Sequence, residues 1–294
     1  MKRLTYTAVA LIALSMRATA VSYELPLPAI PDDMPRAERP DFVVNHFWDC
    51  ITPADSSLTR DREFMEGNAV NFFYLLPYAT TQGRTDAISR ILHTISADSK
   101  GIALYQSLAE QYLGDPESPL YNEDTYITSL QQLLSLPSQE PGIKMRAQFQ
   151  LEMLSKNRPG MKGADFEFAM RDNTTTTLTS IVARPTILLF YDPECDHCLD
   201  AIDTLRIDTN INEMINAGRL DILAVCIEGD KEQWLAVDAK LPSSWISGFD
   251  QSDIIGSDIY YIQHLPAPYL LAADGTVTLT HPTLQERLSS PYLT

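Results

Sequence analysis

Apolar residues recur with a helical period through residues 36–157. Ile88, Ile91 and Ile95 illustrate the spacing of three or four positions that places side chains on one face of a helix. Asn122, which precedes two acidic residues, is typical of a helix N-terminus, because its side chain can accept a hydrogen bond from an exposed backbone N–H. The region contains no segment with the alternation of a strand. Its aromatic residues are expected in the core rather than on a binding surface, namely Trp48, Phe72, Phe73 and Tyr74. The pattern therefore predicts an all-α domain of about six helices.

The hydrophobic pattern changes after Asn157-Arg158-Pro159-Gly160, which is the predicted domain boundary. Phe166 and Phe168 alternate with polar residues ahead of four threonines, and this is typical of a hairpin. Further along, the pattern predicts buried strands at 186–191 and 219–227 and a helix at 201–214. It also predicts an amphipathic helix at 231–240 around Trp234 and Leu235, and a hairpin of 269–271 with 276–279 about Asp274-Gly275. This order predicts an α/β domain with a mixed sheet over residues 158–294.

The N-terminus has the features of a secretory signal. Lys2 and Arg3 precede an apolar run at 8–16, which is shorter than the roughly 20 residues that a membrane-spanning helix needs. Ala18-Thr19-Ala20 fits the small-residue cleavage pattern. We therefore expect a signal peptide over residues 1–20, cleavage near Ala20, export to the periplasm and no membrane span afterwards. Five prolines over the next 20 residues predict an extended arm at 21–35.

The charge and the cysteine content narrow the possible partners. The formal net charge is −17, so nucleic acids and anionic membranes are not expected to bind, because like charges repel. The four cysteines are too few for a disulfide framework of the kind that small secreted domains use. Cys226 lies in a buried-strand pattern and Cys50 is expected to be a half-buried helix residue. A Cys50–Cys226 bridge is neither indicated nor excluded.

The motif Cys195-Asp196-His197-Cys198 follows a predicted strand and opens a predicted helix. The first sulfur would then lie at a helix N-terminus, where backbone N–H groups and the helix dipole favour the thiolate. Cys195 is the expected attacking thiolate, and Cys198 would resolve the mixed disulfide. The alternatives are an inert structural disulfide or half of a metal site. Zinc needs four ligands, and no second cysteine pair supplies them, so no metal and no cofactor are expected.

Residues 158–294 resemble the thioredoxin fold, in the envelope thiol-disulfide branch related to cytochrome c maturation reductants and to redoxin-like proteins. The resemblance is carried by Gly163-Ala164-Asp165-Phe166, by the stretch from Phe190 through Pro193 to Cys198, and by Leu265-Pro266. It implies that Pro266 is cis and lies beside the cysteine pair. It also implies that Leu265 offers its backbone to an extended substrate strand, with Pro193 as a further substrate contact.

The chain departs from the thioredoxin pattern at Leu189, where thioredoxins bury an aspartate that relays a proton. The acceptor would then be Glu194 or a residue on another strand. A protonated His197 would stabilise the thiolate, whereas Glu194 and Asp196 act in the opposite direction, so the direction of electron flow stays open. His264 either faces the cysteine pair or is a plain loop residue. Asp192 stands where peroxiredoxins use threonine, which argues against a thiol peroxidase.

Residues 36–157 resemble a helical domain of unknown function that precedes thioredoxin-like domains in exported bacterial proteins. The resemblance is carried by Phe47-Trp48-Asp49, by 71–77, and by 109–113 with 119–123. The predicted function is an exported thiol-disulfide oxidoreductase that acts on protein thiols and disulfides of the cell envelope, with a membrane electron donor as its partner if it is a reductant. The alternative is a non-catalytic binding or scaffold protein, which Leu189 favours.

Overall fold

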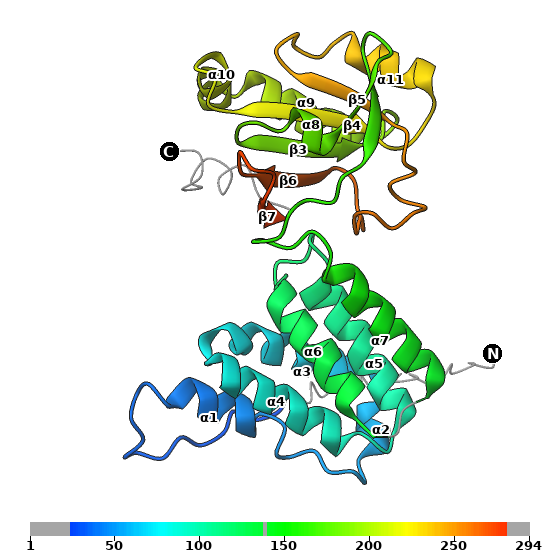
Figure 1. Ribbon diagram of the computed structural model, residues 1–294. Helices are drawn as coiled ribbons and strands as arrows, with labels where there is room; N and C mark the ends of the chain where they lie inside the picture. Colours follow the sequence, from blue (N-terminus) through cyan, green and yellow to red (C-terminus); the bar gives the residue numbers. More distant parts are fainter. Residues whose placement is uncertain (1–23, 138–139, 281–294) are drawn as a thin grey trace, which may run out of the picture.

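The computed structural model describes residues 24–137 and 140–280, and these form two lobes (Figure 1). A helical lobe precedes an α/β lobe with a mixed sheet, which confirms the predicted fold class. The predicted signal peptide at 1–20 lies outside the described residues, as does the start of the predicted arm. The predicted boundary at 157–160 lies between the last helix of the first lobe and the first strand of the second.

The helical lobe packs its helices around aromatic residues that include Phe72, Tyr105 and Tyr126, all fully buried. Asn122 caps the sixth helix, and its side chain accepts a hydrogen bond from the Thr125 N–H at 2.9 Å, as predicted. The α-helices are α1 Arg39–His46, α2 Ser56–Thr59, α3 Arg62–Leu75, α4 Thr81–Thr94, α5 Ser99–Ala109, α6 Glu123–Ser135 and α7 Pro141–Leu154. A 3-10 turn, Leu76–Tyr78, extends α3, and a π-helical turn, Glu110–Gly114, extends α5.

Two expectations for this lobe were wrong. Cys50 is exposed and lies in a turn, because α1 ends at His46, whose ring bonds the Asp49 carboxylate at 2.6 Å. Tyr74 is 57% exposed, although the expectation placed it in the core beside Phe73. A run of consecutive aromatic residues must cover more than one face of a helix, so the period of the pattern does not decide which ring is buried.

The α/β lobe contains a seven-stranded sheet in the order β2-β1-β5-β4-β3-β6-β7. Its strands are β1 Glu167–Met170, β2 Thr175–Thr177, β3 Thr186–Tyr191, β4 Asp221–Cys226, β5 Ile246–Asp250, β6 Ala267–Leu271 and β7 Val277–Thr280. The two central pairings, β3 with β4 and β4 with β5, are parallel, and the other four are antiparallel. Every residue of β3 is buried, as its continuous apolar run predicted.

Strand β5 was missed, because its sequence lacks an apolar alternation. Its centre, Gly248, lies where a Cβ would come within 2.6 Å of the Phe168 ring, so a side chain there would displace strand β1. Ser247 is buried and accepts the indole N–H of Trp234 at 3.0 Å. Small residues therefore serve the close packing of this strand, and their packing partners lie outside the strand itself.

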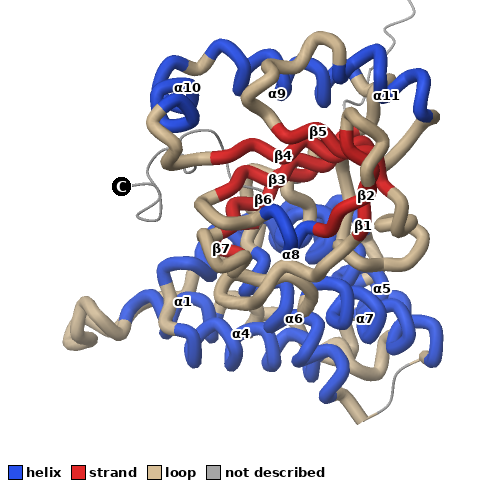
Figure 2. The backbone as a smooth tube through the Cα atoms, turned by 45° about the horizontal axis from the view of Figure 1, so that its top comes forward, coloured by secondary structure: helices blue, strands red, loops and turns tan. Residues whose placement is uncertain are grey.

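Helices α9 Asp196–Ile207, α10 Thr209–Asn216 and α11 Lys231–Asp238 cover one face of the sheet (Figure 2). The short α8, Leu178–Ile181, lies on the other side, toward the helical lobe. The single helix expected at 201–214 is divided, because Asp208 caps α10 by accepting the Ile211 N–H at 2.9 Å. On α11, Trp234 is buried as expected, but Leu235 is 43% exposed.

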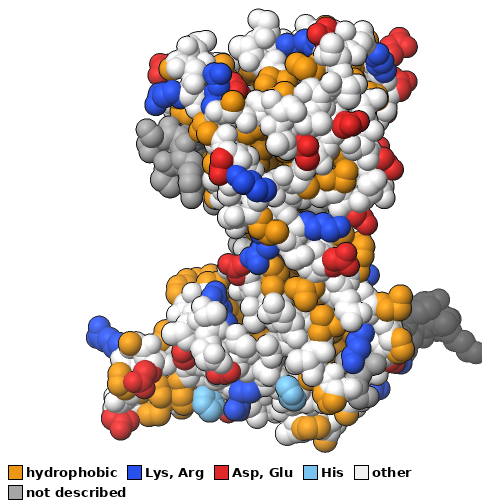
Figure 3. All heavy atoms as spheres, viewed as in Figure 1, with side chains coloured by type: hydrophobic (Ala, Val, Ile, Leu, Met, Phe, Trp, Pro, Cys, Tyr) orange, Lys and Arg blue, Asp and Glu red, His pale blue; other side chains and the backbone are white. Residues whose placement is uncertain are grey.

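The lobes meet at a narrow waist, which Figure 3 shows in the space-filling view. The connecting segment runs along β7, where the Gly160 N–H donates to the Val277 carbonyl at 2.8 Å and the Gly163 N–H donates to the Gly275 carbonyl at 3.0 Å. Among the described residues, none of the helices is long and apolar enough to cross a membrane.

Candidate functional site

Cys195 is the N-cap residue of α9, directly after the turn that follows β3. Its sulfur accepts a hydrogen bond from the Cys198 N–H at 3.3 Å, which is the bond that a thiolate at this position would strengthen. The side chain is half-buried, so a reactant can reach it. The strand-to-helix placement that the motif predicted is confirmed.

Cys198 lies one turn further along α9 and is fully buried. Burial raises the pKa of its thiol to about 12. The neighbouring Cys195 sulfur and the Asp192 charge act in the same direction, and a hydrogen bond with the Asp192 backbone opposes them. Cys198 is therefore protonated at neutral pH. The two cysteines are free thiols that lie close together, so the structure shows the reduced form of the pair.

The loop that precedes β6 brings a third group to the two cysteines. The peptide bond between Leu265 and Pro266 is cis, as the resemblance implied. The Leu265 carbonyl oxygen faces Cys195 and accepts its S–H at a sulfur-to-oxygen distance of 3.8 Å. We call Cys195, Cys198, Leu265 and Pro266 the cysteine site.

The structure places the other candidate residues around this site. Pro193 is buried, and its ring lies 2.9 Å from the position that a Cβ on Gly229 would occupy. His197 is exposed on the first turn of α9. The Glu194 carboxylate is also exposed, and it accepts the side-chain N–H of Gln233 at 2.7 Å, which ties it to the start of α11.

Asp192 is a residue whose role the sequence reasoning missed. It follows β3 directly, and its carbonyl accepts the Cys195 N–H at 3.3 Å while its Oδ1 accepts the Glu194 N–H at 2.8 Å. Its negative charge contributes to raising the pKa of both Cys198 and Cys226, after their burial. Leu189 packs in the same apolar core as Cys198, so an uncharged side chain stands at the position where thioredoxins bury an aspartate. A carboxylate at the end of a buried strand, three residues before the first cysteine, was the available signal.

The substitution Asp192→Asn is expected to lower the pKa of Cys198. The change removes the charge that disfavours the thiolate and keeps an oxygen that can accept the Glu194 N–H. Cysteine Cβ chemical shifts, followed by NMR as a function of pH on the reduced protein, measure the shift directly. Asp196→Asn, at an exposed position, is the matched control. An unchanged Cys198 titration in Asp192→Asn would show that the two groups do not interact.

The remaining cysteines lie apart from the site. Cys226 is buried in β4, as predicted, and its S–H donates to the Glu228 carbonyl at 3.1 Å. Burial raises the pKa of Cys226 to about 12. Cys50 is exposed in the helical lobe, and both cysteines are free thiols, so no bridge joins them here. Within 24–137 and 140–280, no group of three or more His, Cys, Asp or Glu side chains is arranged to hold a metal ion.

His264 does not face the cysteine pair but points across the waist. Its Nε2 lies 3.3 Å from Oδ1 of Asp115, which directly follows the π-helical turn of the helical lobe. His264 directly precedes Leu265, so the helical lobe contacts the loop that carries the cis proline. The sequence left open whether His264 faces the cysteine pair, and its contact with Asp115 of the helical lobe decides against this.

The comparisons with known proteins now identify the family. A family model described as a domain of unknown function, DUF5106, matches residues 6–157, which is more than half of the chain. This chain belongs to the DUF5106 family. The match covers the helical lobe, so the predicted resemblance to a helical domain of unknown function is confirmed.

This DUF5106 protein is also similar to solved structures. It matches a thioredoxin-like protein from Bacteroides caccae with 29% identity and a TM-score of 0.82, over 92% of this chain and 97% of that one. The two-lobed architecture with a thioredoxin-like C-terminal domain is thus shared over nearly the whole length. None of the curated proteins compared with the chain matches it.

Two further structures match less than half of this chain. The C-terminal domain of an uncharacterized protein from Bacteroides fragilis is 27% identical over 46% of this chain and 96% of that one, with a TM-score of 0.44. The thioredoxin domain of a thiol-disulfide oxidoreductase from Bacteroides vulgatus is 14% identical over 44% of this chain and 91% of that one, with a TM-score of 0.39.

Proposed function

We propose that this protein is a thiol-disulfide oxidoreductase that exchanges disulfides with protein substrates at Cys195 and Cys198. The observation that carries the proposal is the arrangement of the two sulfurs. Cys195 is accessible and caps a helix, whereas Cys198 is buried behind it and protonated. This difference is what exchange requires, because one sulfur must attack first and the other must wait until the mixed disulfide has formed.

The exchange proceeds in two balanced steps. The Cys195 thiolate attacks one sulfur of the substrate disulfide, a new S–S bond forms, and the other substrate sulfur leaves as a thiolate that takes up a proton. Cys198 then loses its proton, for which Asp192 supplies the nearby carboxylate, and its sulfur attacks Cys195. The second substrate thiol leaves, so the substrate gains two electrons and the protein ends with a Cys195–Cys198 disulfide. The reverse sequence oxidises a dithiol substrate.

The proposed setting is the periplasm, which the predicted signal peptide supports. A disulfide persists in that compartment, and protein thiols there are the expected substrates. If the protein is a reductant, its disulfide must be reduced again after each turnover, and we propose a membrane electron donor for that step. Kinship with the cytochrome c maturation reductants stays a prediction that the reduction potential addresses.

A second candidate is a binding or scaffold protein that keeps the cysteine pair without turnover. Leu189 supports it, because a fully buried leucine occupies the position where thioredoxins place their proton-relaying aspartate. The two candidates differ in whether Cys198 can be deprotonated within a catalytic cycle.

An equilibrium titration of residues 21–294 against glutathione buffers, with the alkylated cysteines counted by mass, tests the proposal. We expect a reversible two-electron transition of the Cys195–Cys198 pair. A potential between about −120 and −200 mV would indicate an oxidant or isomerase, and one near −250 mV or below a reductant. If the Cys195–Cys198 disulfide can be reduced only after denaturation, the result supports the binding or scaffold candidate instead. Serine at Cys50 removes the exposed thiol, which would otherwise be counted.

A further inference from the structure

The loop between β5 and β6 lies between the two lobes and contacts both of them. Tyr260 enters the α/β core, where its ring packs 4.9 Å from that of Phe190 and its hydroxyl donates to the Ala164 carbonyl at 2.9 Å. The next residue, Tyr261, packs against the core of the helical lobe instead. Leu265, at the end of the same loop, returns to the α/β core and faces Cys195.

Tyr261 lies near the π-helical turn Glu110–Gly114, since the charges of Glu110 and Arg146 both act on its hydroxyl. Turns of this type are rare and often mark functional sites. Gly114 allows the Tyr126 ring to pack onto this turn, because a Cβ on Gly114 would lie 2.6 Å from that ring. Glu110 also holds Arg146 through an ion pair of 2.6 Å. Burial raises the pKa of Tyr261, so its hydroxyl stays protonated and accepts the Gln263 side-chain N–H at 2.9 Å.

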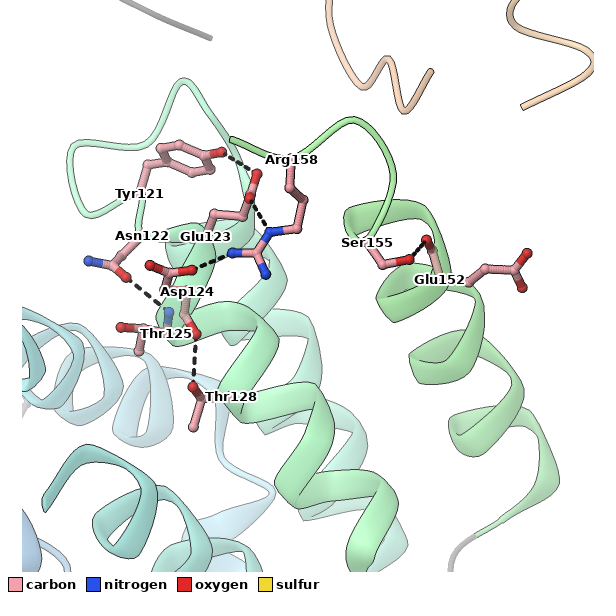
Figure 4. Close-up of polar contacts among 9 residues, drawn as sticks. All are labelled: Tyr121, Asn122, Glu123, Asp124, Thr125, Thr128, Glu152, Ser155 and Arg158. Carbon is pink, nitrogen blue, oxygen red and sulfur yellow. Dashed lines mark hydrogen bonds and ion pairs between the residues drawn. The ribbon is translucent and has the colours of Figure 1, made fainter. Parts of the chain in front are cut away.

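The segment that joins the lobes holds the start of the same loop. The Asn157 amide donates to the Ile259 carbonyl at 2.8 Å and accepts the Ala164 N–H at 2.6 Å. Lys156 donates to the Asp258 carbonyl at 2.8 Å. Arg158 is itself anchored to the first turn of α6 through Glu123 and Asp124, as Figure 4 shows.

One small cavity lies at the contact between the lobes. The cavity lined by Tyr261, Gln263 and Tyr269 on one side and by Met153 and Leu154 on the other has a volume of about 10 Å³, no more than a single water molecule occupies. In the same junction, burial raises the pKa of Glu123 even though Arg158 and the Tyr121 hydroxyl stabilise its charge. The lobes are therefore packed together here and not separated by solvent.

We propose that the helical lobe is a positioning element of the cysteine site, and that it acts by holding Tyr261. With Tyr261 held, the loop 259–265 keeps the Leu265 carbonyl against Cys195. This inference rests on the proposed function. Its consequence concerns the substrate that the resemblance to thioredoxins implies, an extended protein segment that pairs with the Leu265 backbone, and not a small disulfide that makes no such pairing.

Tyr261, and not the ion pair of His264 with Asp115, is the contact that holds the loop 259–265 to the helical lobe. Both side chains of that pair are substantially exposed, at 46% and 34%, so solvent screens their attraction. Tyr261, by contrast, contributes apolar surface to the helical core, and apolar burial is not screened by salt.

The test compares Tyr261→Ala with Tyr261→Phe, which keeps the ring, and with Tyr74→Ala, which removes an exposed tyrosine of the helical lobe. All three carry serine at Cys50 and are reduced beforehand, so that single-turnover rates are measured. The substrates are an extended peptide that contains a disulfide and hydroxyethyl disulfide. We expect Tyr261→Ala to slow exchange with the peptide about tenfold and with the small disulfide less than about twofold. Tyr261→Phe and Tyr74→Ala should behave as the parent protein.

Equal slowing with both substrates would overturn the proposal, because a merely structural defect lowers the active fraction for each alike. Hydrogen exchange of the amides at 259–265 is measured on the same proteins. Faster hydrogen exchange of these amides in Tyr261→Ala alone supports the proposal that Tyr261 holds the loop. Unchanged hydrogen exchange contradicts it. If the parent protein exchanges with neither disulfide, the proposed function fails while the amide measurement still decides whether the helical lobe holds the loop.

Discussion

Replacing Cys195 with serine is expected to abolish disulfide exchange, with a loss on the order of a thousandfold or more, because a serine hydroxyl is not ionised at neutral pH. Replacing Cys198 with serine should have a different effect. Cys195 remains accessible and still attacks, but the mixed disulfide has no resolving thiol and accumulates. The two variants together therefore separate the attacking sulfur from the buried one.

The measurement is non-reducing electrophoresis and mass analysis of the complexes that each variant forms with envelope proteins. Cys50→Ser is the matched control, since it removes an exposed thiol from the helical lobe and should leave exchange unchanged. If mixed disulfides accumulate in Cys195→Ser and not in Cys198→Ser, the attacking and resolving cysteines are the reverse of those assigned. If partners are retained equally by a variant that lacks both cysteines, the binding candidate gains support instead.

Introducing an aspartate at Leu189 is expected to destabilise the fold strongly, although thioredoxins carry an acid there. Leu189 is fully buried among apolar side chains of the core that also contains Cys198. The loss of the leucine side chain and the burial of a carboxyl together predict a decrease of about 4 kcal/mol or more in the free energy of unfolding at neutral pH.

Denaturant unfolding of Leu189→Asp and Leu189→Asn between pH 4 and 8 separates the two contributions. Burial raises the pKa of the new aspartate above its unfolded value of about 3.9, so the folded state binds more protons and stability falls as the pH rises above that value. Leu189→Asn cannot ionise and should show no such added slope. Parallel pH profiles of the two variants would mean that the new carboxylate is solvated or paired.

Much of the cysteine site was predictable because it depends on short stretches of chain. The apolar run of β3, the break after it and the start of α9 lie within about 20 residues, and local propensities determine them. The cap at Asn122 and the hairpin turn at Asp274-Gly275 follow from the same kind of local chemistry. The cis bond before Pro266 was not derivable locally and came from the family resemblance.

The predictions from sequence failed where contacts outside the local hydrophobic pattern decided the structure. Strand β5 forms because Gly248 fits beneath Phe168 and Ser247 binds Trp234, contacts that its own pattern does not express. Helices α9 and α10 are separate because Asp208 caps the N-terminus of α10 instead of continuing α9. The exposure of Tyr74 depends on how α3 is turned against its neighbours.

The sequence alone determined that the chain has a helical part, an α/β part and a cysteine pair at a strand-to-helix turn, because period, caps and turn residues act over a few positions. Only the tertiary structure decided that Asp192 is the charge beside Cys198 and that the helical lobe holds the loop before Pro266. Lys156 and Asp258, which meet at that contact, are 102 residues apart. Contacts at such separations depend on how whole elements pack, and no local pattern records them.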